Sequence, residues 1–340
     1  MSKPVFTCGI AGYGYMGEIR KQVIEKSDRL ELIGISDINA NTRQELSGCA
    51  VLSTTDALLD KSPDIMFVCT PNALSPKICV EAMRRGIHVF CEKPPGRNLD
   101  DIQTIIAAER HSVKLMFGFN HRFHPAVIKA KAIVDAGRMG AVLNLRGLYG
   151  KSGGISFHNS WRNDESISGG GILLDQGIHM LDLFCYFCGN FEDVKCFSSR
   201  AYWDFNVEDN AYVIMRNSTG QNAIFHSSAT LWKHTFRLEI TLEHGYIVVE
   251  GLLSKSGSYG RERLVTAKRQ FEDEAAAVGN PSEEVTYFDQ DLSWELEVNE
   301  LIRCIDEDTP VTISSSHDAR RVMEIISKAY LDASNNPGAA

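Results

Sequence analysis

The chain has 340 residues, of which 44% are hydrophobic and 23% are charged, enough for two domains of ordinary size with filled cores. Its formal net charge is −9 and it contains no long basic run, which argues against nucleic acid or an anionic membrane as a partner. No apolar stretch could span a membrane and the N-terminal residues lack an apolar signal core, so we expect a cytoplasmic protein whose nine cysteines are reduced.

A glycine-rich turn follows the first apolar segment. Residues 5–11 are predicted as a strand and residues 18–26 as a helix, and between them lies Gly12-Tyr13-Gly14-Tyr15-Met16-Gly17. In this context Gly12 allows a tight turn, Gly14 lets the backbone approach a pyrophosphate, and Gly17 lets the helix pack closely on the strand. The helix N-terminus offers amide groups to the phosphates, so Tyr15 and Met16 are also predicted cofactor contacts. The alternative interpretation is an ordinary glycine loop.

Asp37 ends the next predicted strand, residues 30–36. An acidic side chain at this distance from the glycine turn accepts hydrogen bonds from the ribose 2′-hydroxyl and repels a 2′-phosphate. The sequence therefore favours NAD over NADP as the cofactor. The alternative for Asp37 is a surface turn residue.

Strands and helices alternate through the first 120 residues, which predicts an α/β fold with a doubly wound parallel sheet. The remaining elements predicted in this part are strands at 65–69, 87–92 and 114–119 and helices at 75–85 and 100–111.

After a helix at residues 125–136 the pattern changes to alternating apolar and polar residues, most clearly at 236–243. This alternation predicts an antiparallel sheet with one covered face. The other elements predicted here are strands at 143–149, 194–202, 211–216 and 223–228, an exposed loop at 272–284, helices at 292–306 and 317–331, and a flexible tail at 335–340.

The triplet Glu92-Lys93-Pro94 follows the predicted strand 87–92. Ligands of doubly wound sheets bind at the carboxyl ends of the strands, so Lys93 is expected to point toward a nicotinamide. The alternative is a solvated turn lysine.

Asp175 and His179 lie four positions apart in an apolar segment that follows Gly169-Gly170-Gly171. In a helix these two side chains share one face, and a polar pair on an apolar helix needs a partner or a function. The glycines permit close approach of a flat ligand or a neighbouring segment. The alternative is a buried Asp-His hydrogen bond that only stabilises packing. Cys185 and Cys188 are interpreted as core residues, and we predict no metal site.

Over almost its full length the chain resembles the glucose-fructose oxidoreductase and inositol 2-dehydrogenase family, Gfo/Idh/MocA. The resemblance rests on the motifs Gly12 to Gly17, Thr70-Pro71-Asn72, Cys91-Glu92-Lys93-Pro94, Asn120-His121-Arg122-Phe123, Trp161-Arg162 and Gly169 to His179. The chain departs from the family pattern at Ala73-Leu74-Ser75, where a histidine is common, and at His121, where an arginine is common.

The resemblance implies an N-terminal Rossmann domain at residues 1–121 and a C-terminal α+β domain at 122–334, whose open, mainly antiparallel sheet forms homodimers or homotetramers. It adds Thr70, Pro71, Asn72, Glu92 and Lys93 to the cofactor contacts. It implies catalysis by Lys93 and His179, with Asp175 orienting a hydroxyl or His179. It places Lys93, Asn120, Arg122, Lys151, His158, Trp161, Arg162, Asp175 and His179 around the substrate.

The expected reaction is hydride transfer between the nicotinamide and a secondary hydroxyl of a sugar, cyclitol or nucleotide sugar. An imidazole near neutrality suits the proton transfer, so His179 is the predicted general base, and Lys93 would stabilise the developing alkoxide. Two alternatives are an NAD-dependent glycosidase without net redox change and a dinucleotide-sensing regulator without catalysis.

Overall fold

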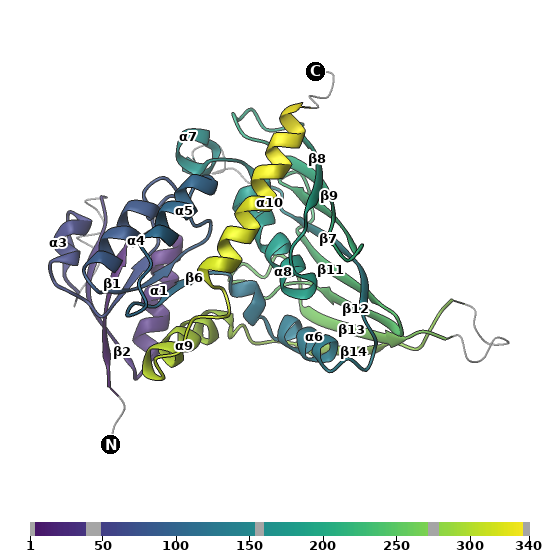
Figure 1. Cartoon of the computed structure of the whole chain (residues 1–340), viewed down its shortest axis with the longest axis horizontal. Coiled ribbons are helices and arrows are strands. Elements are labelled where there is room, and N and C mark those ends of the chain that lie inside the picture. The colour runs from purple at the N-terminus through teal and green to yellow at the C-terminus, as the bar shows by residue number, and fades with distance from the viewer. Residues whose placement is uncertain (1–3, 39–48, 154–159, 271–278, 336–340) are drawn as a thin grey trace. The chain divides into compact units, whose positions relative to one another are not determined.

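The computed structural model describes residues 4–38, 49–153, 160–270 and 279–335. The chain forms two compact units (Figure 1). The first consists of Met1–Phe119, Ser166–Gly169 and Trp294–Arg320, and the second of Asn120–Glu165, Gly170–Ser293 and Arg321–Ala340. The segment Trp294–Arg320 therefore belongs to the first unit, although the sequence analysis placed it in the second domain.

The first unit contains a six-stranded sheet in which every strand pair is parallel, in the order β3-β2-β1-β4-β5-β6. Its strands are β1 Phe6–Ala11, β2 Leu30–Ser36, β3 Val51–Leu52, β4 Ile65–Val68, β5 His88–Cys91 and β6 Leu115–Phe117. Its helices are α1 Tyr15–Lys26, α3 Thr55–Leu59, α4 Ser75–Arg84, α5 Leu99–Ala107 and, from Trp294 on, α9 Ser293–Asp306. This order confirms the predicted doubly wound parallel sheet.

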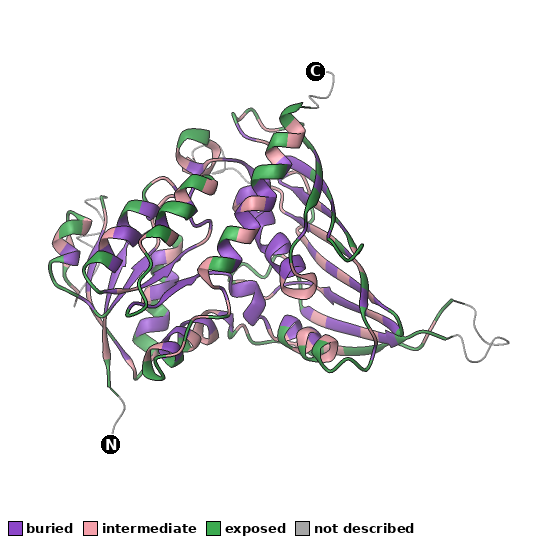
Figure 2. Cartoon of the chain, in the orientation of Figure 1, coloured by how far each residue is buried: buried purple, intermediate pink, exposed green. Residues whose placement is uncertain are grey.

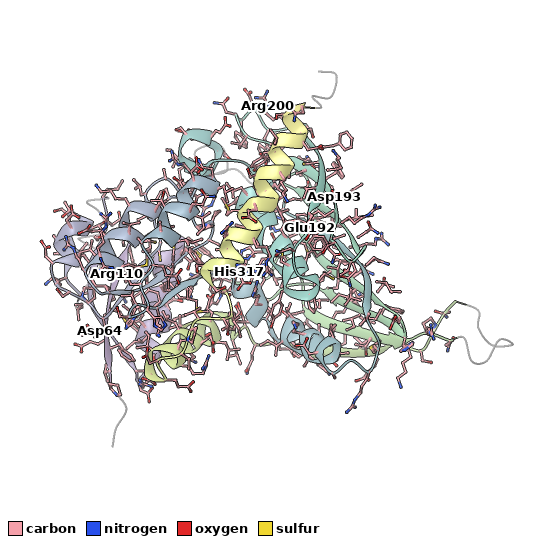
Figure 3. All side chains as sticks on the ribbon, viewed as in Figure 1. Asp64, Arg110, Glu192, Asp193, Arg200 and His317 are labelled. Carbon is pink, nitrogen blue, oxygen red and sulfur yellow. The ribbon has the colours of Figure 1, made fainter. Side chains whose placement is uncertain are left out.

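The central strands of this sheet are short apolar runs, because both of their faces are covered. Every residue of β4 is buried. Asp64, labelled in Figure 3, precedes β4 and links it to β1, since the backbone N–H and the hydroxyl of Thr7 both donate to Asp64 Oδ2 at 2.7 Å. Figure 1 shows α4 and α5 side by side.

The second unit contains an eight-stranded sheet in the order β14-β13-β12-β11-β7-β10-β9-β8. Its strands are β7 Val142–Gly150, β8 Asp193–Ser199, β9 Asn210–Arg216, β10 Asn222–Ser228, β11 Thr235–Leu242, β12 Gly245–Glu250, β13 Glu262–Lys268 and β14 Glu284–Phe288. Among the described strands of this second sheet, only β10 and β7 pair in parallel, and the other neighbours are antiparallel. The predicted mainly antiparallel sheet is therefore confirmed.

Helices α6 Pro125–Asp135 and α8 Ile178–Cys188 contact this sheet, α6 over β12 and β13 and α8 over β7. Figure 2 shows buried and exposed residues in alternation along its strands, and in β9 Ala211, Val213 and Met215 are buried while the residues between them are exposed. This is the pattern of a sheet with one covered face. The other α-helices of the described residues are α7 Glu165–Ser168 and α10 Ser316–Asn335, and α10 passes from the first unit to the second.

Two predicted irregular segments differ from the structure. Glu284, placed in an exposed loop, is the first residue of β14, and residues 272–278 of that loop lie outside the described residues. Asn335, placed in the flexible tail, is the last residue of α10, and residues 336–340 are not described. Across the described parts of the chain, no helix combines the length and the apolarity needed to cross a bilayer.

Candidate active site

A pocket of about 310 Å³ opens at the carboxyl ends of β1 and β2 in the first unit. Gly12, Asp37, Thr70 and Pro71, four of the predicted cofactor residues, line it. The carboxyl edge of a doubly wound sheet is where such folds bind dinucleotides, because helix N-termini and loop amides converge there.

The three glycines of the turn have distinct surroundings. Gly12 has a φ of +86°, and a Cβ there would lie 2.8 Å from the Cys69 carbonyl oxygen. A Cβ at Gly17 would lie 2.3 Å from the Gly12 carbonyl oxygen, whereas a Cβ at Gly14 would meet no atom within 4 Å. Gly12 and Gly17 are therefore required by the fold. The open space at Gly14 would let a ligand approach the protein backbone there.

This difference makes Gly14→Ala and Gly17→Ala a matched pair. Gly14→Ala should change the free energy of unfolding by less than about 0.5 kcal/mol, because Gly14 has an ordinary extended conformation and open surroundings. It should weaken NADH binding by roughly tenfold, since the methyl group enters the space of the ligand, an overpacking cost of about 1–3 kcal/mol. Gly17→Ala should destabilise the protein itself. Thermal unfolding and a fluorescence titration with NADH measure the two effects, and equal loss of stability in both variants would contradict this assignment.

Asp37 connects the end of β2 to the glycine turn. Its Oδ2 accepts a hydrogen bond from the Tyr13 backbone N–H at 2.6 Å, and the residue also lines the pocket. Tyr15 is 56% exposed at the start of α1, and Met16 is half-buried. The Asp37 carboxylate thus lies at the pocket, while cofactor contacts by Tyr15 and Met16 stay predictions.

The Thr70-Pro71-Asn72 turn after β4 holds a neighbouring segment. Thr70 Oγ1 lies 3.1 Å from Ser75 Oγ, and Asn72 Nδ2 donates to the Ser168 carbonyl at 2.7 Å. The Ala73 backbone N–H donates to the Ile167 carbonyl at 3.1 Å. Asn72 is buried, so its observed role is to fix residues 166–169, and a cofactor contact stays a prediction.

Glu92 is buried below the Lys93 turn in an ion triad. Arg20 Nε donates to Glu92 Oε1 at 2.6 Å, and Arg20 Nη2 lies 2.6 Å from Glu297 Oε1 on α9. The guanidinium also lies over the Phe90 ring, 4.3 Å from its centroid. Burial alone would lower the pKa of Arg20, but Glu297 and then Glu92 outweigh it and raise this pKa above its ordinary value. The triad fixes the Glu92 carboxylate. The predicted contact between Glu92 and the cofactor stays a prediction.

Replacement of Arg20 should therefore be costly. Arg20→Met leaves two carboxylates in the same buried space without the guanidinium, and we expect a loss of about 3–5 kcal/mol in the free energy of unfolding. Glu297→Gln is the matched control, because it leaves one carboxylate opposite the guanidinium and should cost clearly less. Chemical denaturation measures both, and an equal loss in the two variants would show that charge pairing is not the cause.

Lys93 lies at the carboxyl end of β5, and the Lys93–Pro94 peptide bond is cis. Lys93 is half-buried. It belongs to the first unit, whereas Asp175 and His179 belong to the second. The joint action of these three residues stays a prediction.

In the second unit, the segment around Asp175 is a π-helical turn, Leu173–Gly177, that continues directly into α8. The sequence analysis expected an ordinary helix here. The preceding glycines allow close packing: a Cβ at Gly170 would lie 2.2 Å from the Tyr330 hydroxyl, and one at Gly171 would lie 2.0 Å from the Glu208 carbonyl oxygen. A π turn in such a place is a frequent feature of functional sites.

Glu208, which the sequence analysis did not identify, anchors this turn. Its carboxylate accepts the Gly171 N–H at 2.8 Å, the Leu173 N–H at 3.0 Å and the Tyr330 hydroxyl at 2.9 Å. Burial raises the pKa of Glu208, and these hydrogen bonds only partly oppose it. A half-buried glutamate far away in sequence thus stabilises the start of the helix that carries His179.

The Asp175 carboxylate is held by two cations. Lys151 Nζ lies 3.0 Å from Asp175 Oδ2, and Arg162 Nε lies 3.0 Å from Asp175 Oδ1. The Arg162 guanidinium also lies over the Trp161 ring, 4.5 Å from its centroid. Four of the predicted substrate residues therefore form one polar cluster. His158, predicted to join them, lies outside the described residues.

His179 lies in the first turn of α8, buried to 5% exposure, and its ring stacks on that of His121. The ring centroids are 3.7 Å apart and the planes are inclined by 20°. His121 Nδ1 lies 3.0 Å from Asn120 Oδ1, and His121 Nε2 lies 3.1 Å from the Tyr149 hydroxyl. Asn120, a predicted substrate residue, thus contacts His121.

Arg122 forms a buried ion pair. Its Nε and Nη2 donate to the two carboxylate oxygens of Asp182 on α8 at 2.8 and 2.7 Å, and both side chains are almost fully buried. The guanidinium lies 4.6 Å from the Tyr186 ring centroid. This placement does not support the predicted substrate contact, because the bidentate pair with Asp182 already satisfies the planar edge of the guanidinium.

Tyr149 contacts His121, and Gln176 and Tyr259 lie next to Tyr149; none of the three was predicted. Gln176 Nε2 donates to the Tyr259 hydroxyl at 2.5 Å, and the Tyr149 and Tyr259 rings are 5.6 Å apart. Burial raises the pKa of Tyr149, and it raises that of Tyr259 to about 12. Their sequence positions carried no signal, because a tyrosine in a half-buried strand or a loop is common.

The strand order, the pocket at the carboxyl edge and the glycine turn at α1 define a dinucleotide-binding protein. The family model described as "Oxidoreductase family, NAD-binding Rossmann fold" matches residues 6–119, and that of the "GFO/IDH/MocA C-terminal domain" matches residues 127–248. The chain belongs to the Gfo/Idh/MocA family, and its first unit carries the NAD-binding Rossmann fold of these oxidoreductases.

Several curated proteins are similar to parts of the chain. Levoglucosan dehydrogenase of Pseudarthrobacter phenanthrenivorans is 35% identical over 150 residues, covering 42% of this chain and 38% of the relative. An uncharacterized oxidoreductase of Bacillus subtilis is 31% identical over 198 residues, covering 56% and 55%. Myo-inositol 2-dehydrogenase of Thermotoga maritima is 25% identical over 258 residues, covering 72% and 75%. The first two matches thus span about half or less of the relatives' lengths.

Solved structures resemble the whole chain. Levoglucosan dehydrogenase in complex with NADH has a TM-score of 0.84 at 21% identity, covering 97% of both chains. A structure named as an NADPH-dependent oxidoreductase, from Desulfitobacterium hafniense, has a TM-score of 0.87 at 18% identity, covering 98% of this chain and 97% of the other. At these identities the similarity establishes the fold.

Proposed function

We propose that this protein is an NAD-dependent dehydrogenase that acts on a secondary hydroxyl of a sugar, a cyclitol or a nucleotide sugar. The observation that carries the proposal is the buried His179 imidazole at the start of α8, four positions after an Asp175 carboxylate held by Lys151 and Arg162. An imidazole that follows an ordered polar cluster by one helical turn in sequence suits proton transfer to or from a bound hydroxyl.

The residues of the first unit fit a dinucleotide. The adenosine and phosphate groups would lie in the pocket at the carboxyl ends of β1 and β2. They would meet the open space at Gly14, the Asp37 carboxylate, and the lining residues Thr70 and Pro71. When bound, the nicotinamide supplies the hydride acceptor of the reaction. Asp37 favours NAD, since its negative charge would repel a 2′-phosphate.

His179 would remove the proton of the substrate hydroxyl during oxidation and return it during reduction. Lys93 would donate a hydrogen bond to the same oxygen, and its positive charge would stabilise the alkoxide that develops as the hydride leaves the carbinol carbon. Protons and electrons balance, because the carbinol loses a hydride to the cofactor and a proton to His179.

The cluster around Asp175 supports the proposed substrate class. A carboxylate with two cations offers both acceptors and donors to neighbouring hydroxyl groups, and the exposed part of Trp161 offers an apolar face to a sugar ring. The relatives named as dehydrogenases of levoglucosan and myo-inositol agree with a polyhydroxylated substrate.

The test is a panel of free sugars, inositols, sugar phosphates and nucleotide sugars with NAD or NADP, in which NADH or NADPH absorbance is followed. A substrate that the unchanged protein oxidises, and that Lys93→Ala and His179→Ala do not, would support the proposal. Binding of NADH without turnover of any compound would favour a dinucleotide-sensing regulator. Cleavage of a glycosidic bond without accumulation of NADH would favour the redox-neutral glycosidase.

We further propose that two copies associate through the exposed face of the eight-stranded sheet. Phe197 pairs with Tyr212, and Ile214 pairs with Ile224, so these exposed apolar side chains are contiguous across β8, β9 and β10. A monomer rarely exposes such a patch, and a two-fold axis lets one patch cover its copy. Light scattering after gel filtration tests this, with Ile224→Glu expected to yield monomers; a monomeric unchanged protein would refute it.

We also assign the protein to the cytoplasm. No disulfide links the cysteines of the described residues, which suits a reducing compartment. Fractionation of the native host, with detection of the chain by an antibody, tests this assignment.

A further inference from the structure

His121 lies in a directed chain of hydrogen bonds within the second unit. The Ser293 hydroxyl donates to Asp291 Oδ1 at 2.6 Å, because a carboxylate only accepts. Because the hydroxyl hydrogen of Ser293 is used in this bond, Ser293 Oγ accepts a hydrogen bond from Asn120 Nδ2 at 3.3 Å. This orients the Asn120 amide, so its oxygen is the atom 3.0 Å from His121 Nδ1.

The orientation of Asn120 determines the tautomer of His121. An amide oxygen accepts only, so His121 Nδ1 must carry a hydrogen. In the neutral ring Nε2 is then an acceptor, and it lies 3.1 Å from the Tyr149 hydroxyl, which can donate to it. Burial keeps Tyr149 protonated, since it raises the pKa of this phenol well above its ordinary value.

The stack with His179 favours a neutral His121 as well. Two charged imidazoles with centroids 3.7 Å apart would repel each other, and His121 is 4% exposed, so desolvation adds to that cost. A neutral His121 ring instead offers a π face to His179 when His179 takes up a proton. The flat contact also restricts the orientation of the His179 ring.

Other titratable groups surround the pair. His124, 5.4 Å from His121 between ring centroids, is bonded through Nδ1 to Glu262 Oε2 of β13 at 2.8 Å. Tyr149 faces His121 from β7, His179 faces it from α8, and Asp175 acts on Tyr149 electrostatically. From β11 the neighbour is the apolar Phe236, at 5.7 Å.

We propose that His121 is a positioning residue for His179. The series of hydrogen bonds that begins at Asp291 fixes His121 as the neutral Nδ1–H tautomer, and the His121 ring holds the His179 ring by stacking. The role of His179 as the base rests on the proposed function. The tautomer of His121 does not, so the two can be tested separately.

The first test is nuclear magnetic resonance of the full chain with ¹⁵N-labelled histidine rings, with and without NADH, between about pH 6 and pH 8, the range around the ordinary histidine midpoint. His121→Phe and His179→Phe assign the signals. We expect His121 to keep the neutral Nδ1–H signature throughout, and Ser293→Ala to weaken that preference. An Nε2–H signature, or full protonation near the middle of the range, would overturn the proposal whether or not the protein is a dehydrogenase.

The second test uses turnover once a substrate is known. His121→Ala should lower kcat by roughly 10- to 100-fold with KM nearly unchanged, because a misplaced base slows the chemical step. His121→Phe, which keeps an aromatic face, should recover part of this loss. His317→Ala is the control: this exposed residue at the start of α10, labelled in Figure 3, belongs to the first unit and should leave kcat and the His121 signals unchanged. Equal kcat in His121→Ala and the unchanged protein would refute the positioning role.

Discussion

Replacement of His179 by Gln should lower kcat for substrate oxidation by about 10²- to 10⁴-fold, the usual contribution of a general base. Gln keeps the approximate length and polarity of the side chain but cannot take the proton at neutral pH. NADH binding should change little, because the dinucleotide pocket is lined by residues of the first unit and His179 belongs to the second.

Steady-state turnover with saturating substrate and a fluorescence titration with NADH measure the two quantities. Far-ultraviolet circular dichroism of His179→Gln shows whether α8 is preserved. His317→Gln, the same exchange at an exposed position, serves as the control. If His179→Gln turned over at a rate near that of the unchanged protein while folded, His179 would not be the base.

The second large effect is expected at Asp37. Asp37→Ser should weaken NADH binding by roughly 10- to 100-fold, because hydrogen bonds to a charged acceptor contribute about 1.5–3 kcal/mol. It should also improve NADPH binding, since the charge that opposes the 2′-phosphate is gone. The preference for NADH over NADPH should therefore fall by about 100-fold or more, as the two effects add.

Asp37 also accepts the Tyr13 N–H at 2.6 Å, so a loss of NADH affinity in Asp37→Ser has two contributions. Asp37→Asn separates them, because its amide oxygen can still accept from Tyr13 while the charge is removed. We expect Asp37→Asn to gain NADPH affinity and to lose less NADH affinity than Asp37→Ser. Calorimetric titration of both nucleotides decides this, and tighter binding of NADPH by the unchanged protein would reverse the assignment.

Local patterns predicted most elements of the first unit. β2 spans residues 30–36 as expected, and α4 ends one residue before the predicted end, because apolar strands and amphipathic helices there follow their own periodicity. The strands β12, β13 and β14 were not predicted. β12 is a short apolar run of mixed burial, and such a run cannot be told from a buried helix segment without its paired neighbours.

The site was predicted in its residue types more than in its contacts. The sequence analysis placed Asp175, Lys151 and Arg162 near a substrate, and the structure brings these three together. It could not predict that Arg122 pairs with Asp182, or that Glu208 holds the start of the helix, because each pair joins segments far apart in the chain. His121 was noted only as a departure from a family pattern.

The sequence by itself determined the class of the protein. The glycine turn, the Glu-Lys-Pro triplet and the Asp-to-His spacing are local patterns, and their chemistry can be inferred without knowing the fold. Only the tertiary structure decided which charged groups serve the site and which serve the core. The sequence does not distinguish Arg20 and Arg122 from Arg162. In the structure the first two are buried beside carboxylates, whereas Arg162 is partly exposed. The physical reason is that the function of a charge depends on its desolvation and its nearest partner, and both are set by segments distant along the chain.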